Sequence, residues 1–281
     1  MKEIRTRAVL SSWLAKERAK GKRIGFVPTM GALHAGHMSL AARARAENDI
    51  YVCSVFVNPK QFNNPADLAA YPRTLESDLE KLARAGCDAV FCPDVLEMYP
   101  DEAVKRYDFG HLDKVMEGKF RPGHFNGVAV VVDKLFEMVK PDRAYFGRKD
   151  FQQLRIVREM AALEGHETEI VSCPTEREDD GLAMSSRNVR LTEGQRKAAP
   201  RIFKGLMKAR EMFSSYSLEE IKENVVAFIN RSPELQVEYF DIVCENTLLP
   251  AVSPDSQGEL VACIAVYAGE VRLIDNLSLN S

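Results

Sequence analysis

Residues 24–38 read IGFVPTMGALHAGHM, and the rest of the chain is organised around this stretch. Ile24 to Val27 is a short apolar run suited to a buried strand, and Pro28 is expected to end it. Gly31 and Gly36 allow a tight turn, and apolar residues recur at helical spacing beyond it. The stretch therefore predicts a strand, a turn and the start of a helix.

Two histidines, His34 and His37, lie where this helix is expected to begin. The free backbone N–H groups and the dipole of a helix N-terminus favour an anion, so the stretch predicts a phosphate-binding site. Two other interpretations stay open: histidines that only cap or pack, and a metal-binding pair. The metal interpretation is less favoured, because no cysteine or acidic residue lies nearby at a recognisable ligand spacing.

Composition excludes several classes of protein. The chain has 281 residues, with Lys+Arg 38 against Asp+Glu 41 and a formal charge of -3, so it lacks the bulk charge that attracts nucleic acid. The amphipathic N-terminus and the absence of a long apolar run predict a cytoplasmic enzyme with no membrane partner. The cysteines form no Cys-x-x-Cys pair and are expected to be reduced core residues.

Apolar and helical segments alternate through the first part of the chain. This alternation is typical of an α/β fold, and it predicts a Rossmann-like, doubly wound parallel sheet in a domain of residues 1–176. Further strands are expected at 49–57, 87–92, 144–146 and 169–173, and helices at 6–20, 74–85, 128–139 and from Asp150 to about Glu164.

The pattern changes in residues 177–281, which are expected to form a smaller α+β domain. Two helices with capping boxes, Thr192-x-x-Gln195 and Ser217-x-x-Glu220, precede strands near 236–244, 259–268 and 271–275. The charged run 176–180 is interpreted as a solvated connection.

Two segments are expected to act as lids over a site, residues 58–72 and residues 117–127. The first is polar and follows a predicted strand. The second holds three glycines and a proline, so it is predicted to be a mobile loop rather than a packed element.

Five blocks carry a resemblance to a known family: PTMGALHAGH (28–37), VFVNPKQF (55–62), RPGHFNGV (121–128), YFGRKDFQQL (145–154) and DGLAMSSRN (180–188). The His-x-Gly-His spacing resembles the nucleotidylyltransferase superfamily, and the five blocks together resemble the pantothenate synthetase family. Two positions depart from the family pattern. Arg148 stands where the family more often has Glu, and Glu176 stands where an apolar residue is usual.

The resemblance implies an ATP-dependent condensation of pantoate with β-alanine, with Mg²⁺, a pantoyl-adenylate intermediate, and release of AMP and pyrophosphate. It also implies a homodimer that forms through the first domain. Attack of a carboxylate on the α-phosphorus of ATP needs preorganised donors more than a strong base, and this chemistry suits histidine, lysine, serine and arginine side chains.

The resemblance implies catalytic roles for His34, His37, Lys149, Ser185, Ser186 and Arg187. It implies that ATP contacts Met30, Gly31, His34, Gly36, His37, Gly147, Arg148, Lys149, Asp150, Glu176, Met184, Ser185, Ser186 and Arg187. Gln61 and Gln153 would hold pantoate, and Asp150 would help to hold the metal ion.

Two alternatives to this function stay open. One is a nucleotidylyltransferase that leaves the nucleotide on its product, and the other is a catalytically silent ATP-binding protein. The sequence contains no Gly-x-Ser-x-Gly and no Walker motif, so an acyl-enzyme or a P-loop mechanism has no support.

Overall fold

The computed structural model describes residues 1–101, 105–254, 256 and 258–280. The chain divides into two compact units. Unit 1 comprises Met1–Lys114, Gly118–Arg148 and Gln153–Pro174, and unit 2 comprises Val115–Glu117, Lys149–Gln152 and Thr175–Ser281. The short segments 115–117 and 149–152 therefore group with unit 2, although they lie inside the range expected for the first domain.

Unit 1 is built on a six-stranded parallel sheet in the order β1-β4-β3-β2-β5-β6. The strands are β1 (Lys2–Ile4), β2 (Ile24–Thr29), β3 (Ile50–Val55), β4 (Ala89–Phe91), β5 (Arg143–Gly147) and β6 (Glu169–Cys173). This sheet confirms the predicted α/β class. Strand β1 was not predicted, because three residues are too few to show a periodicity.

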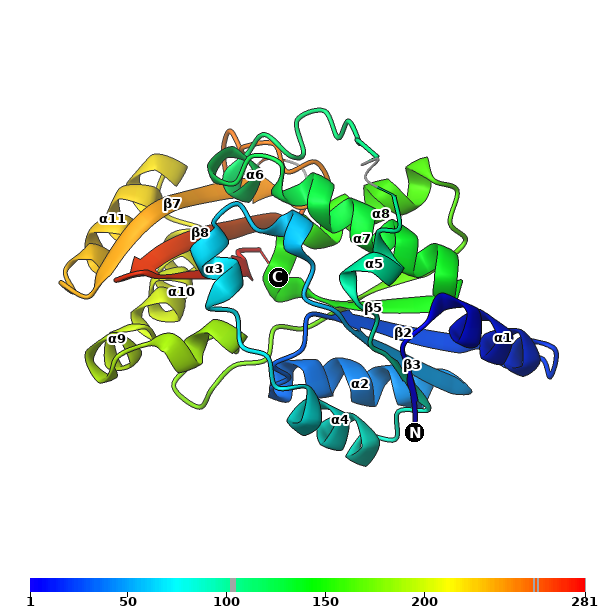
Figure 1. The fold of residues 1–281 in the computed structure, drawn as a ribbon. Helices are drawn as coiled ribbons and strands as arrows, with labels where there is room; N and C mark the ends of the chain where they lie inside the picture. The colour runs from blue at the N-terminus through cyan, green and yellow to red at the C-terminus, as the bar shows by residue number, and fades with distance from the viewer. Residues whose placement is uncertain (102–104, 255, 257, 281) are drawn as a thin grey trace. The chain divides into compact units, whose positions relative to one another are not determined.

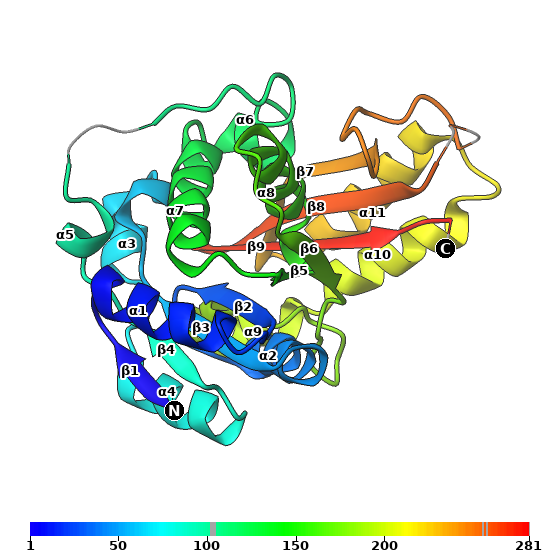
Figure 2. The same ribbon diagram turned by 90° about the vertical axis from the view of Figure 1, so that its right-hand side faces the viewer.

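Helices cover both faces of this sheet, so the doubly wound arrangement is confirmed (Figures 1 and 2). One face carries α1 (Arg7–Arg18), α7 (His124–Val139) and α8 (Phe151–Leu163), and the other carries α2 (Ala35–Glu47) and α4 (Leu75–Arg84). Shorter helices are η1 (Pro59–Gln61), α3 (Pro65–Ala69), α5 (Val95–Met98), α6 (Met116–Phe120) and η2 (Arg148–Asp150).

Pro28 does not end the first predicted strand, and that prediction is wrong. Strand β2 continues to Thr29, and Pro28 pairs in register with Ser54 of β3. On its other side, β2 pairs with β5 only at Gly25 and Phe26. Pro28 thus lies where the strand has one neighbour, and a proline without an N–H group is tolerated in such a place.

The prediction of a mobile loop at 117–127 is also wrong. The segment contains most of α6 and the first turn of α7, and Glu117 and His124 are only 6% exposed. A Cβ atom on Gly118 would lie 2.1 Å from the carbonyl oxygen of Asp113, and one on Gly127 would lie 2.3 Å from that of Lys60. These glycines therefore allow close packing of backbone against backbone rather than mobility.

Unit 2 is an antiparallel sheet of β7 (Leu235–Cys244), β8 (Leu260–Ala268) and β9 (Val271–Ser278), packed against α10 (Arg201–Met212) and α11 (Leu218–Asn230). It also contains η3 (Ser186–Arg190) and α9 (Glu193–Ala198). Both predicted capping boxes are present, at Thr192 and Ser217. Three helices replace the expected two, because Pro200 separates α9 from α10.

The charged run 176–180 is not simply a solvated connection. Arg177 within it is half-buried, and its guanidinium makes two hydrogen bonds to the carboxylate of Asp275 on β9. The cysteines agree with the expectation of reduced core residues, since none of them forms a disulfide and all but Cys244 are buried. No helix in the described part of the chain is both long and apolar enough to cross a membrane.

Candidate functional site

The carboxyl end of the sheet in unit 1 gathers several of the predicted site residues. Strand β2 lies between β3 and β5, and the helix after β2 covers the opposite face from α7 and α8. This change of face makes the β2/β5 boundary the topological switch point, where open α/β sheets bind ligands. The turn after β2 and the Gly147-Arg148 pair after β5 both lie at this edge.

The turn between β2 and α2 is held in an unusual conformation. Gly31 has a φ of 81°, and Ala32 also has a positive φ, of 50°. The fully buried carboxylate of Asp78 accepts hydrogen bonds from the backbone N–H groups of Ala32 (2.9 Å) and Leu33 (2.8 Å). These bonds stabilise the strained turn. Asp78 was not predicted as a site residue, because it lies on α4, far from the motif in sequence.

His34 and His37 cap the helix that follows this turn. His34 is the N-cap residue of α2, and its Nδ1 atom accepts a hydrogen bond from the N–H of Gly36 (3.2 Å). The Nδ1 atom of His37 accepts one from the N–H of His34 (3.3 Å), which completes a capping box. The two rings lie 4.1 Å apart between centroids. Because both Nδ1 atoms accept, each neutral ring carries its proton on Nε2.

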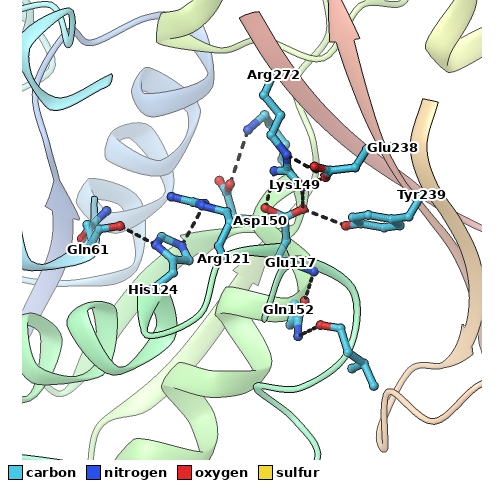
Figure 3. A network of polar contacts seen from close by, with 11 residues as sticks. Gln61, Glu117, Arg121, His124, Lys149, Asp150, Gln152, Glu238, Tyr239 and Arg272 are labelled. Atoms are coloured by element: carbon cyan, nitrogen blue, oxygen red, sulfur yellow. Dashed lines mark hydrogen bonds and ion pairs between the residues drawn. The ribbon is translucent and has the colours of Figure 1, made fainter. Parts of the chain in front are cut away.

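Gln61 lies next to this turn in unit 1. Its Nε2 atom is 3.1 Å from the Sδ atom of Met30, and Asn58, which is 1% exposed, donates to its Oε1 (3.2 Å). The backbone oxygen of Gln61 is 2.7 Å from Nδ1 of His124, whose Nε2 is 3.1 Å from Arg121 (Figure 3). Since Arg121 is always a donor, His124 donates through Nδ1 to Gln61.

Asn58 and His124 therefore orient Gln61, although neither was predicted as a site residue. A buried hydroxyl, that of Tyr99, donates to Oδ1 of Asn58 (2.8 Å), and burial raises the pKa of Tyr99. This bond leaves the amide nitrogen of Asn58 to donate, both to Gln61 and to the carbonyl of Gly127 (3.0 Å). A polar residue directly after the predicted strand 49–57 was the signal in the sequence that could have identified Asn58.

Lys149, Ser185, Ser186 and Arg187 of the predicted site belong to unit 2, whereas Arg148 belongs to unit 1. Lys149 has a mostly buried side chain, and its Nζ lies 3.4 Å from Oδ1 of Asp150, which is more exposed. Ser185 caps the η3 helix by accepting from the N–H of Arg187 (3.2 Å), and Ser186 is the first residue of that helix. Two cations and two hydroxyls thus lie on segments of one compact unit.

The other predicted site residues lie at these same segments. Met184 donates from its N–H to the carbonyl of Glu176 (3.0 Å), so both are in one hairpin before Ser185. A Cβ atom on Gly147 would meet no described atom within 4 Å, so the surrounding chain does not itself require glycine there. Gln153 is half-buried on the first turn of α8.

A buried ionic network in unit 2 fixes the segments around Lys149 (Figure 3). The carboxylate of Glu117 accepts two hydrogen bonds from Arg272 (2.6 and 2.7 Å) and one from Tyr239 (2.8 Å). Gln152 accepts from the N–H of Glu117 (2.9 Å). Burial by itself would lower the pKa of Arg272, but hydrogen bonds to Glu117 and Glu238 raise it overall.

No group of three or more His, Cys, Asp or Glu side chains in the described part of the chain has the arrangement of a metal site. Asp150 is the residue that was predicted to help hold Mg²⁺, and it lies beside Lys149. A lone carboxylate is compatible with Mg²⁺, which usually keeps several waters and is shared with substrate phosphates.

Comparison with known proteins identifies the family of the chain. The profile of the pantoate-beta-alanine ligase family matches residues 2–278. A pantothenate synthetase from Porphyromonas gingivalis strain W83 is 53% identical over 99% of both chains, and one from Bacteroides thetaiotaomicron is 51% identical over 99% of this chain and 98% of that one.

Solved structures give the same result. The pantothenate synthetase of Thermus thermophilus has a TM-score of 0.93 and 44% identity, with 100% of both chains covered. The pantoate-beta-alanine ligase of Francisella tularensis, solved with beta-gamma ATP and beta-alanine, has a TM-score of 0.83 and 35% identity, with 100% of this chain and 98% of that chain covered.

Proposed function

Because the chain belongs to the pantoate–β-alanine ligase family and so condenses pantoate with β-alanine in an ATP-dependent reaction, we propose that it does so through pantoyl adenylate. A carboxylate oxygen of pantoate attacks the α-phosphorus of ATP, and the bond to pyrophosphate breaks. The amine of β-alanine then attacks the acyl carbon and displaces AMP. In the first step, negative charge grows on phosphoryl oxygens and on pyrophosphate, so fixed donors are required.

The capped turn after β2 is the observation that carries this proposal. Both Nδ1 atoms accept hydrogen bonds from backbone N–H groups, so each neutral ring donates through its Nε2–H group. We assign them to the phosphate oxygens of ATP, with His37 as the proton donor. The capping bonds hold both rings before the substrate arrives, and preorganised donors need no reorganisation during the reaction.

Lys149, Ser185, Ser186 and Arg187 are assigned to the same triphosphate. A lysine ammonium is a compact point charge suited to polyphosphate, and an arginine fork with two hydroxyls matches phosphoryl oxygens. Mg²⁺, bound with ATP and assisted by Asp150, would neutralise part of the phosphate charge. No described atom lies within 4 Å of the position that a Cβ on Gly147 would take. This space supports the proposal that the nucleotide comes close to the backbone of Gly147.

Gln61 and Gln153 are assigned to pantoate. A neutral amide orients a carboxylate without engaging both oxygens as an arginine fork would, so one oxygen stays available to attack. Asn58 and His124 hold Gln61 in place, which favours a defined pose for the acid. The Francisella relative was solved with beta-alanine, which supports binding of the second substrate to the same kind of protein.

We also propose that the protein works as a homodimer formed through residues 1–176, and in the cytoplasm. The dimer is inferred from the family, and the location from the amphipathic N-terminus and the lack of a long apolar run in the sequence. Light scattering of the purified protein tests the dimer directly, and a monomeric mass at assay concentration would contradict it.

Isotope transfer tests the adenylate step. Pantoate labelled with ¹⁸O in its carboxylate should transfer one ¹⁸O atom to AMP, and ATP–pyrophosphate exchange should depend on pantoate and not on β-alanine. Formation of ADP with ¹⁸O in inorganic phosphate would instead indicate an acyl phosphate and would refute the proposal.

A further inference from the structure

Strand β9 carries two buried polar residues side by side in unit 2. Asp275 is 4% exposed and Asn276 is 5% exposed, within a sheet whose other buried residues are mostly apolar. The Asp275 carboxylate also accepts from the N–H of Asn276 (2.8 Å). Buried charges of this kind need partners, and the partners here come from two distant parts of the chain.

The first partner is Arg177. Its Nη1 atom is 2.6 Å from Oδ2 of Asp275, and its Nη2 atom is 2.9 Å from Oδ1, which is a bidentate ion pair. Arg177 also donates to the carbonyl of Gly181 (3.1 Å) and lies 3.9 Å above the ring of Phe203. Arg177 pairs with Ala183 across an isolated antiparallel bridge, so these contacts anchor the whole hairpin.

This hairpin leads directly into the Ser185-Ser186-Arg187 segment. Gly181 at its turn has a φ of 92°, and a Cβ atom there would lie 2.5 Å from the ring of Phe203. The hairpin is therefore pressed against α10 and tied to β9. The position of Ser185, which follows it, is set by these two anchors.

The second partner is Lys149. The side-chain amide of Asn276 donates to the backbone oxygen of Lys149 (2.9 Å). The positive charge of Lys149 also acts on Asp275: burial raises the pKa of that carboxyl, and the charges of Arg177 and Lys149 oppose the rise. One short stretch of β9 thus contacts both Lys149 and the hairpin that leads into the Ser185–Arg187 segment.

We propose that Arg177, Asp275 and Asn276 form a positioning strut, which holds Lys149 and the Ser185–Arg187 segment at a fixed separation suited to the triphosphate of ATP. This inference rests on the proposed function, because it takes those two segments to be the phosphate contacts. In this proposal the three strut residues act through Lys149 and the Ser185–Arg187 segment rather than on the reacting atoms. Their effect is to keep cationic and hydroxyl donors in place before ATP binds.

Stability alone does not explain an ion pair of this kind. Replacing a buried ion pair by apolar residues is often neutral or stabilising, so the pair is better explained by the geometry it imposes than by the energy it contributes. A strut should then affect the step that uses the triphosphate, and not the step that starts from the acyl adenylate.

The test compares the two half-reactions in Asn276→Ala, Arg177→Met and Arg177→Lys. Asn276→Ala removes one neutral hydrogen bond, and we expect KM for ATP to rise about 5-fold. Arg177→Met should lower pantoate-dependent ATP–pyrophosphate exchange by about 100-fold, as expected when positioning is lost, with partial recovery in Arg177→Lys. Conversion of supplied pantoyl adenylate and β-alanine to pantothenate should be unchanged.

A matched control is Asp133→Asn in unit 1. Asp133 is also buried, and its carboxylate accepts hydrogen bonds from Tyr107 (2.7 Å) and Lys105 (3.4 Å) and is hydrogen-bonded to His166 (2.8 Å), all in unit 1. This variant should leave KM for ATP unchanged.

Two results would overturn the strut: wild-type KM for ATP in folded Asn276→Ala together with wild-type exchange in folded Arg177→Met, or equal losses in both half-reactions. The variant Lys149→Met shows whether the strut alone is wrong or whether the proposed phosphate contacts are wrong as well. If Lys149→Met loses exchange while the strut variants keep it, the strut alone is wrong. If Lys149→Met keeps full exchange, the phosphate assignment is wrong and the strut with it.

Discussion

Replacing His37 by glutamine separates the structural role of this side chain from its proposed chemical role. His37 is the third residue of α2, and its Nδ1 accepts from the N–H of His34 at 3.3 Å. Glutamine is the usual residue at this position of a capping box, so its side-chain oxygen can replace Nδ1. The imidazole Nε2–H, which we assign to phosphate, is lost.

The magnitudes of the two effects differ enough to be told apart. Loss of the cap in His37→Ala should cost about 1 kcal/mol, against a total stability of about 5–15 kcal/mol, so nearly all the protein stays folded. Loss of one preorganised donor should lower turnover by about 10²-fold or more, which corresponds to about 2.7 kcal/mol. His37→Gln should keep the cap and lose the turnover.

The assay is turnover with saturating ATP, pantoate and β-alanine, together with urea unfolding of each variant. Ser217→Ala is the matched control, because it removes the capping box of α11. It should lose about 1 kcal/mol of stability and keep wild-type turnover.

Two outcomes would refute this reasoning. Near wild-type turnover in folded His37→Gln would remove the imidazole from the mechanism. A loss of turnover in Ser217→Ala as large as that in His37→Ala would mean that the assay reports stability rather than chemistry.

Gln61→Ala and Gln153→Ala should raise KM for pantoate more than they lower kcat, which steady-state kinetics will measure; an equal loss in kcat would argue against a binding role. Glu117→Gln should lower the free energy of unfolding by about 3 kcal/mol and Tm by about 6–12 °C. The expected loss is at the low end for a broken buried ion pair, because the arginine partner of Glu117 keeps a second carboxylate. Burial raises the pKa of Asp133, but hydrogen bonds and nearby charge lower it overall. The stabilising contribution of the Asp133 carboxylate is therefore present above about pH 4 and is lost as the pH falls. In acid unfolding experiments, the wild type should lose more stability than Asp133→Asn between about pH 5 and 3. EDTA should stop ATP–pyrophosphate exchange, and Mg²⁺ should restore it; exchange that persists in EDTA would argue against the metal.

Local patterns in the sequence were sufficient to predict much of the fold. Strand β6 was predicted at 169–173 and found at Glu169–Cys173, and both capping boxes were found where they were expected. Apolar runs, caps and helical spacing each depend on residues a few positions apart, so they can be read without knowing the rest of the chain.

The turn at the end of β2 was predicted only in part. The sequence placed His34 and His37 at a helix start, and the structure confirms that position. It did not indicate that Asp78 would hold the turn, or that Asn58 and His124 would hold Gln61. Asp78 and His124 are far in sequence from the residues that they hold and meet them only when the chain folds, whereas Asn58 is three positions from Gln61 and its contact depends on the local turn.

What the sequence determined by itself was the order of strands and helices, their caps, and the chemical groups available to a site. Only the tertiary structure decided what Gly118 and Gly127 do and which charges are paired. Glu117 meets Arg272 across 155 positions of sequence, and Arg177 meets Asp275 across 98. The physical reason is that a glycine or a charge takes its role from the atoms that approach it, and those atoms arrive from elsewhere in the chain.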